Sequence, residues 1–320
     1  MEDTQKAPAR AARVALIGAP CDVAAGMRGA TMGPEALRVA GIAEALRGLG
    51  YDTEDRGNLS GPIHPGRPAD PAGPDGGYRH LAETATWLDT AREAVAAALS
   101  DGTLPLLLGG DHALSAGSTA AVAAHCAAAE KPLVVLWIDA HADFNTAATS
   151  PSGNIHGMPA ALLCGVGPAA ILDRLGQTPV LTPDQMIQVG VRSVDAAEKR
   201  AVVDHGLQVH DMRTIDERGL RAVMGEVLDQ VAARGAHLHI SFDVDVLDPQ
   251  VAPGVGTPVP GGLTYREAQL CMEMIHDSGC LGSLDVVEVN PARDHGNRTA
   301  EVTVELVESL FGEQILARML

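Results

Sequence analysis

Short runs of apolar residues alternate along the chain with longer stretches rich in alanine and leucine. Several of the apolar runs are apolar at nearly every position, which is typical of strands buried on both faces of a sheet. The runs that are typical of strands occupy 13–18, 104–108, 133–139, 187–191, 207–211, 237–243 and 284–290. The stretches between them consist of residues that favour helix, for example at 87–99, 115–130 and 220–235.

Strands that alternate with helices predict a parallel sheet that helices cover on both faces. We therefore expect an α/β fold, with a single domain over residues 13–320 and a flexible N-terminal tail over residues 1–12. The segment 61–78 is dense in proline and glycine and predicts a surface loop. It lies inside the domain, because the rhythm of strand and helix continues unchanged after it.

Composition narrows the class of protein. Hydrophobic residues make up 46% of the 320 residues and charged residues 20%, and no apolar run approaches the roughly 18 residues of a membrane span. The N-terminus has no apolar segment typical of a secretory signal. The five cysteines form no CxxC pair, which argues against a disulfide framework and a thiolate zinc site. We expect a soluble, cytoplasmic protein.

The net charge limits the partners. It is −18, with a sequence pI near 4.9, so the protein repels phosphate backbones and anionic lipid surfaces. Nucleic acid and membrane are therefore excluded as expected partners. A cationic small molecule would be attracted to such a surface.

Acidic residues follow four of the predicted strands. The motifs are GGDH (109–112), DAHAD (139–143), DVD (243–245) and EVN (288–290). Ligands of open parallel sheets bind beyond the carboxyl ends of the strands. A spacing of two along an extended chain places side chains on the same side, so we expect the acids and histidines of these motifs to converge.

Converging carboxylates require positive charge, because buried like charges repel and take up protons. The four aspartates of DAHAD and DVD carry −4, which two divalent ions would balance. Oxygen ligands with a minority of imidazole and no thiolate favour Mn²⁺, with Co²⁺ or Fe²⁺ as substitutes. Two such ions can share a water, lower its pKa and hold the hydroxide for attack on an electrophilic carbon.

The sequence does not support other reactions that are common among α/β proteins. It has no G-x-S-x-G motif and no phosphate-loop motif, and no G-x-G-x-x-G follows its first strand.

The motifs resemble those of the ureohydrolase (arginase–agmatinase) family, and within it the arginases. The likeness rests on GGDHALS, DAHADFNT, SPSGNIHGMP and SFDVDVLDPQVAPGVGTPVPGGLTYRE, and it extends from GAPCDVAAGMRGATMGPEALR to VEVNPARDHGNRTAEVTVELVESLFG. This resemblance implies a three-layer α/β/α fold with a mainly parallel eight-stranded sheet. It also implies two Mn²⁺ per chain, hydrolysis of L-arginine to L-ornithine and urea by a metal-bridging hydroxide, and a homotrimer or homohexamer.

The same resemblance assigns roles to individual residues. Those in the positions of metal ligands are His112, Asp139, His141, Asp143, Asp243 and Asp245. Those in the positions that bind the α-carboxylate are Asn145, Ser150, Ser152 and Asn154. Asp195 matches the acid that faces the α-amino group, and Glu198 a second, often water-mediated, contact. Glu288 would pair with the guanidinium, with Thr257 near it. Asp143 would pass a proton to the leaving amine, and His156 would exchange protons with solvent.

Other interpretations stay open. An agmatinase or guanidinobutyrase would share the metal ligands, although agmatinases usually lack Asn145 and the SGN loop. A catalytically silent relative that acts as a binding subunit and a one-metal, zinc-dependent deacetylase are further alternatives. Many arginases have an acid where this chain has Ser193. An aspartate at a strand end is most often a turn or cap residue, and the polar residues of the loop could be ordinary turn residues.

Overall fold

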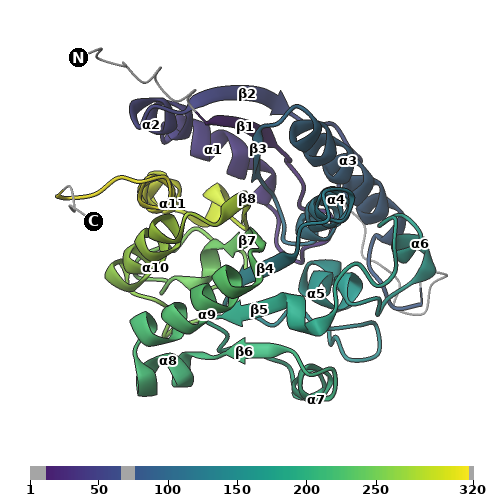
Figure 1. Cartoon of the computed structure of the whole chain (residues 1–320). Helices are drawn as coiled ribbons and strands as arrows, with labels where there is room; N and C mark the ends of the chain where they lie inside the picture. Colours follow the sequence, from purple (N-terminus) through teal and green to yellow (C-terminus); the bar gives the residue numbers. More distant parts are fainter. Residues whose placement is uncertain (1–11, 66–75, 317–320) are drawn as a thin grey trace, which may run out of the picture.

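Eight strands form one sheet in the computed structural model, which describes residues 12–65 and 76–316 (Figure 1). The strands lie in the order β2-β1-β3-β8-β7-β4-β5-β6, and every neighbouring pair is parallel. Nearly all of the predicted tail and residues 66–75 of the predicted loop lie outside the described residues. The strands are β1 (Arg13–Gly18), β2 (Asp52–Asn58), β3 (Leu104–Leu108), β4 (Leu133–Ile138), β5 (Met186–Val189), β6 (Gln208–His210), β7 (His237–Asp243) and β8 (Leu281–Val287).

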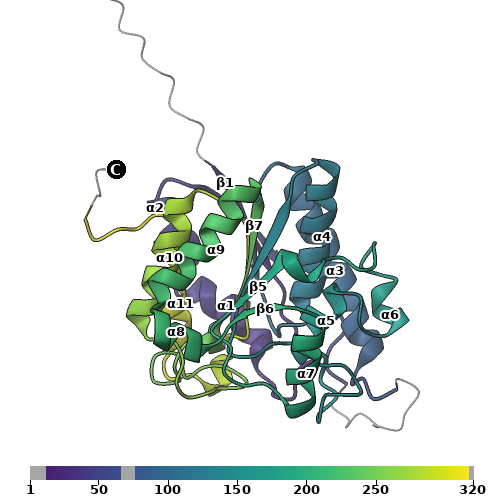
Figure 2. The ribbon, with the colours of Figure 1, turned by 60° about the horizontal axis from the view of Figure 1, so that its bottom comes forward.

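Helices cover both faces of the sheet, which confirms the predicted three-layer α/β/α architecture. Helices α1, α2, α9, α10 and α11 lie on one side, and α3, α4 and α5 on the other (Figures 1 and 2). The helices are α1 (Gly33–Val39), α2 (Ile42–Gly48), α3 (Leu81–Ser100), α4 (Leu114–Ala128), α5 (Pro159–Leu163), α6 (Ala169–Leu172), α7 (Ala196–Asp204), α8 (Met212–Arg218), α9 (Leu220–Arg234), α10 (Tyr265–Ser278) and α11 (Arg298–Leu310). In the described part of the chain, no helix combines the length and apolar character needed to span a membrane.

Strands β3 and β4 are apolar on both faces because each face of the sheet has its own core. Side chains that point to one face, such as Leu106 and Leu136, pack with α1, α2, α9, α10 and α11. Their neighbours Leu107 and Trp137 point to the other face and pack with α3, α4 and α5. The sheet is therefore buried on both sides, as its near-continuous apolar runs predict.

Two strands differ clearly from the sequence prediction, whereas the ends of the others lie within two residues of the predicted positions. Strand β2 was not predicted, because its sequence DTEDRGN is polar; it lies at an edge of the sheet and pairs only with β1 among the described strands. Strand β8 begins at Leu281 and ends at Val287 instead of spanning 284–290. It ends there because Glu288 adopts a left-handed conformation, with φ of 65°, which no pattern of hydropathy reveals.

The order of the strands places the four motifs together. Strands β3, β8, β7 and β4 are successive neighbours, and they precede GGDH, EVN, DVD and DAHAD respectively. The carboxyl ends of parallel strands lie at the same edge of a sheet, so all four motifs meet at one place near its middle.

Candidate active site

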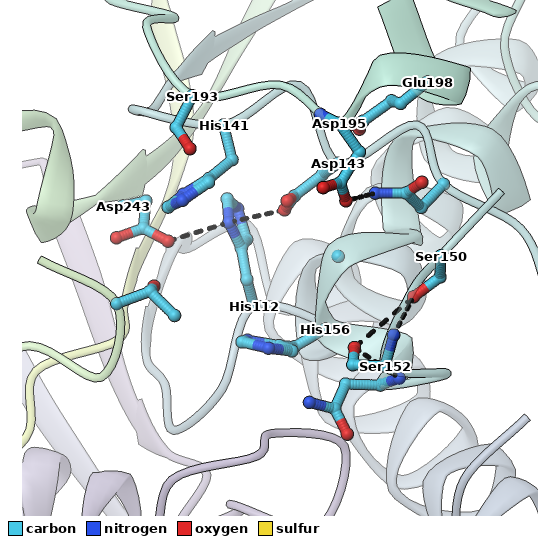
Figure 3. A pocket seen from close by; sticks show the side chains of 14 residues that line it. His112, His141, Asp143, Ser150, Ser152, His156, Ser193, Asp195, Glu198 and Asp243 are labelled. Carbon is cyan, nitrogen blue, oxygen red and sulfur yellow. Dashed lines mark hydrogen bonds and ion pairs between the residues drawn. The ribbon is translucent and has the colours of Figure 1, made fainter. Parts of the chain in front are cut away.

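His112 lies at the centre of the converging motifs. Its Nδ1 is 3.0 Å from Asp139 Oδ2, 3.0 Å from Asp143 Oδ2 and 3.1 Å from Asp243 Oδ2. All four side chains are buried, and Figure 3 shows the imidazole between Asp143 and Asp243. The predicted convergence of these residues is confirmed.

His141 forms a second group with carboxylates, beside the group around His112. His141 Nδ1 is 3.0 Å from Asp245 Oδ2 and 3.4 Å from Asp139 Oδ1. Asp139 therefore directs one oxygen to each histidine. Two sets of ligand atoms are compact enough to hold an ion, namely His112, Asp139 and Asp243, and Asp139, His141 and Asp245.

The backbone that delivers these residues is less regular than the two-residue spacing implies. Asp245 lies in a single 3₁₀ turn (η4, Val244–Val246) rather than in an extended strand, and its N–H donates to Asp243 Oδ1 at 2.8 Å. Asp143 has a φ of 50°. The spacing indicated the right residues, but turns rather than an extended chain bring them together.

Burial and mutual repulsion dominate the electrostatics of the cluster. Burial raises the pKa of Asp243 well above its usual range, and the charges of Asp245 and Asp139 raise it further. Burial and the charge of Asp139 also raise the pKa of Asp143, to about 6. Burial lowers the pKa of His141, but its carboxylate neighbours, Asp245 first, raise it to about 12. The carboxylates thus demand positive charge.

The donor set suits divalent metal ions. His112 Nδ1 and Asp143 Oδ2 are buried and have no hydrogen-bond partner among the described residues, although such groups are normally satisfied. They point at each other together with further carboxylate oxygens. Oxygen-rich ligation with two imidazoles and no thiolate fits ions such as Mn²⁺.

Further residues hold the ligands in place. The Nε2 of His112 is 2.7 Å from Ser241 Oγ, and the imidazole stacks on Trp137 with ring centroids 4.3 Å apart. The indole N–H of Trp137 donates to Asp139 Oδ2 at 3.0 Å. The hydroxyl of Thr257 donates to Asp245 Oδ2 at 3.1 Å. Such supporting bonds orient metal ligands and tune their affinity.

His156 and Glu288 form a pair beside the cluster. His156 Nδ1 is 2.9 Å from Glu288 Oε1, which also accepts the main-chain N–H of His112 at 2.9 Å. Burial lowers the pKa of His156, but the charge of Glu288 raises it to about 9. Burial raises the pKa of Glu288, yet His156 lowers it to a net value below its usual range. The pair is therefore ionised at neutral pH.

A cavity of about 210 Å³ leads from the cluster to the surface (Figure 3). Asn145 lines it and donates from Nδ2 to Asp195 Oδ2 at 3.1 Å. Ser150 lines it too, but its Oγ accepts the main-chain N–H of Gly153 at 2.9 Å, as in an ordinary turn. The predicted residues on this lining are His112, His141, Asp143, Asn145, Ser150, Ser152, Asn154, His156, Asp195, Glu198, Asp243 and Thr257. Asp139, Asp245 and Glu288 lie behind them, buried.

Glu198 connects two parts of the lining. One carboxylate oxygen accepts the N–H of Phe144 at 2.8 Å and the other that of Asp195 at 3.1 Å. The side chain is only 3% exposed, and burial is the main reason that its pKa is raised to about 7. Its oxygens thus join the main chain of Asp195, at the start of α7, to that of Phe144 in the loop after β4.

Three residues near the site were not singled out by the sequence analysis. Trp137 stands two positions before Asp139 and Ser241 two positions before Asp243, so the two-residue period was the available signal. Asp111, next to His112, is fully buried and accepts the N–H of Ala24 at 2.9 Å.

The chain is similar to known arginases over most of its length. The family model described as Arginase family matches residues 12–312. The arginase of Bacillus caldovelox is 43% identical over 303 residues, which cover 95% of this chain and 99% of that protein. The arginase of Brucella melitensis is 42% identical over 304 residues, with coverage of 95% and 97%.

Solved structures show the same likeness. The structure of the Bacillus caldovelox arginase matches with a TM-score of 0.90 and 42% identity, over 95% of this chain and all of that one. The structure of Entamoeba histolytica arginase in complex with L-ornithine matches with a TM-score of 0.86 and 28% identity, over 95% of this chain and 100% of that one. The chain therefore belongs to the arginase family and is a hydrolase that acts on a guanidino group.

Proposed function

We propose that this protein is an arginase, which hydrolyses the guanidinium group of L-arginine to L-ornithine and urea with two Mn²⁺ ions per chain. The observation that carries this proposal is the pair of ligand groups that share Asp139 at the base of a polar cavity. The arginase relatives and the L-ornithine bound in one of them support the choice of substrate.

The metal ligands would be the five residues of the two groups together with Asp143. His112, Asp139, Asp143 and Asp243 surround one position, and Asp139, His141 and Asp245 the other. Bound Mn²⁺ ions would supply a nucleophile by lowering the pKa of water, and would stabilise negative charge that develops in the transition state. Co²⁺ or Fe²⁺ could replace Mn²⁺.

The residues beside the cluster bind the substrate's cationic end and move protons. Glu288 is buried and ionised, so its carboxylate can pair with the guanidinium of arginine. Thr257 lies beside this position. Asp143 accepts a proton from the attacking water and passes it to the leaving amine of ornithine. His156, cationic beside Glu288, donates or accepts protons between the site and solvent.

The residues nearer the surface select the amino-acid end of the substrate. Asn145, Ser150, Ser152 and Asn154 offer amide and hydroxyl groups to the α-carboxylate, and Asp195 offers a carboxylate to the α-ammonium group. Glu198 holds Asp195 and Phe144 through their main-chain N–H groups, which supports this role and leaves any contact of its own with the substrate to a bridging water.

We also propose the setting in which the enzyme works. A single domain over residues 13–320 would form a homotrimer or homohexamer in the cytoplasm. The acidic surface, with a net charge of −18, attracts cationic arginine.

The proposed function is tested by urea release from L-arginine and from agmatine, together with metal analysis of the purified protein. We expect two Mn²⁺ per chain and faster turnover of arginine, because agmatine has no α-carboxylate to meet the polar loop. Faster turnover of agmatine would contradict the choice of substrate. Replacement of Asp143 by asparagine should abolish urea release while the fold is kept.

A further inference from the structure

Arg192 has an unusual set of partners for an arginine so close to a cluster of acids. Its guanidinium donates to main-chain carbonyl oxygens rather than to carboxylates. The bonds run from Nε to Val259 O (3.2 Å), from Nη1 to Val246 O (3.0 Å) and Gly190 O (3.4 Å), and from Nη2 to Val259 O (2.7 Å), Asp245 O (2.8 Å) and Leu247 O (3.2 Å). One side chain thus joins the end of β5, the turn after β7 and the loop that contains Val259.

The turn after β7 needs such a donor. The 3₁₀ turn at Val244–Val246 is a single turn, with one N–H of the following residue, Leu247, bonded back to Val244 O. A turn this short leaves its later carbonyls without partners inside the turn, and a buried carbonyl without a partner is costly. Arg192 supplies N–H groups to three successive carbonyls there, those of Asp245, Val246 and Leu247. The carbonyl of Val246 also accepts the main-chain N–H of Leu263 at 3.0 Å.

These bonds fix the main chain of Asp245, a candidate metal ligand, and the loop that carries Thr257, its hydrogen-bond partner. The carboxylate of Asp245 lies 3.0 Å from His141 Nδ1 and accepts the hydroxyl of Thr257 at 3.1 Å. Arg192 holds the main chain of Asp245 on one side and that of Val259, two residues after Thr257, on the other. The guanidinium of Arg192 therefore holds both main-chain segments whose side chains, Asp245 and Thr257, are hydrogen-bonded to each other.

Gly262 packs closely against the guanidinium of Arg192. A Cβ added to Gly262 would lie 2.5 Å from Nη2, so only glycine at that position lets the side chain reach its partners. Five N–H groups in a planar fork can meet carbonyls in several directions, whereas a lysine ammonium is a point charge with three donors. The shape of the group, more than its charge, accounts for the contacts.

We propose that Arg192 is a positioning residue for one of the two metal positions, the group of Asp139, His141 and Asp245. This inference rests on the proposed two-metal function. It assigns to Arg192 no contact with the substrate. It predicts that loss of the guanidinium weakens this metal position selectively, while the group of His112, Asp139 and Asp243 keeps its ion.

The test is a titration of the chelator-stripped protein with Mn²⁺, in which electron paramagnetic resonance measures free Mn²⁺. We expect the wild-type protein to bind two ions, and Arg192→Lys and Arg192→Gln to bind the second ion about 10- to 100-fold more weakly, the range usual for lost support of a metal ligand. Arg192→Lys keeps the charge, so it separates shape from charge. Arg234→Lys is the control, because Arg234 donates to a single main-chain carbonyl, that of Asp184 at 2.8 Å, away from the site.

Each outcome decides the question. If the wild type binds two ions and hydrolyses arginine but either Arg192 variant binds both ions with unchanged affinity, the inference is wrong and the proposed function stands. If the wild type itself binds fewer than two ions, the proposed function fails and this inference fails with it. If both variants lose both ions together with their circular dichroism signal, Arg192 supports the fold as a whole and the selective role is overturned.

Discussion

Among single residues, Asp139 connects the two candidate metal positions, and its carboxylate is oriented by hydrogen bonds from the indole of Trp137 and from the main-chain N–H of His141. The indole N–H donates to Asp139 Oδ2, the oxygen that also faces His112. Trp137→Phe keeps an aromatic ring against the imidazole of His112 and removes only this donor. We expect about 10-fold weaker binding of Mn²⁺, measured by titration of the metal-free protein.

Trp87 offers a matched control for that variant. Its indole N–H donates to Pro62 O at 2.8 Å, and the residue is almost as buried as Trp137, but it takes no part in the ligand groups. Trp87→Phe should lose a similar hydrogen bond and leave Mn²⁺ affinity unchanged. Equal affinities of Trp137→Phe and the wild type would show that the bond does not tune the metal position.

Glu198 makes stability depend on pH. Its folded-state pKa of about 7 lies above its ordinary value of 4.5, mainly because of burial. A raised pKa contributes stability that is fully present below pH 4.5 and is lost as the pH rises through 7. For the metal-free protein, we expect the free energy of unfolding of the wild type relative to Glu198→Gln to fall by about 3 kcal/mol between pH 4.5 and 8. Urea unfolding of both proteins across this range measures the difference, and parallel pH profiles would contradict it.

Among the elements, α4 depends on close contact with α3. Gly117 of α4 packs against the main chain of α3, where an added Cβ would lie 2.3 Å from Leu88 O. Because α4 begins directly after the GGDH motif, this contact also sets the position of His112. Gly117→Ala should destabilise the protein by about 1–3 kcal/mol through overpacking, although alanine is the better helix former. Thermal or urea unfolding measures the change.

Gly225 of α9 provides the opposite case. It is also a helical glycine, but a Cβ added there would meet no atom within 4 Å. Gly225→Ala should therefore stabilise the protein by up to about 1 kcal/mol, the difference in helix propensity. If both alanine variants were stabilised, the close approach of α3 and α4 at Gly117 would be refuted.

The elements also show what the sequence could predict. Strand β3 was predicted at both ends, because it lies inside the sheet and its sequence LPLLL is apolar at every position. Strand β2 escaped prediction because an edge strand can be polar, and the end of β8 because it depends on the φ of Glu288. Burial can be recognised in the residue types of a strand, whereas its position at an edge of the sheet and the φ of a single residue cannot.

The same reasoning applies to the candidate site. The candidate ligands could be predicted because they follow neighbouring strands and carry distinctive side chains. The backbone of Asp143 and Asp245 was not, since a positive φ and a 3₁₀ turn are not visible in a two-residue spacing. Arg192 was missed for a further reason. Its partners are main-chain carbonyls, which every residue has, so the sequence holds no sign of them.

In the whole molecule, four buried aspartates lie at the middle of the sheet of a protein whose net charge is already −18. Without metal, the histidines can neutralise them only by taking up protons, as the raised pKa of His141 indicates. Ions that bind only the folded state stabilise it by mass action. We therefore expect removal of metal by a chelator to lower the midpoint of thermal unfolding. Addition of Mn²⁺ at about 100 times its dissociation constant should restore about 2.7 kcal/mol per bound ion.

The shared ligand makes this prediction specific. Because Asp139 contributes an oxygen to both groups, Asp139→Asn should remove most of the stabilisation by Mn²⁺. Asp245→Asn should remove only about half, because it leaves the group of His112, Asp139 and Asp243 intact. Calorimetric unfolding of the wild type and both variants, with and without Mn²⁺, measures these differences. An equal response of the two variants to Mn²⁺ would mean that the ions do not depend on a common carboxylate, and a wild type that does not respond would exclude metal binding at this edge of the sheet.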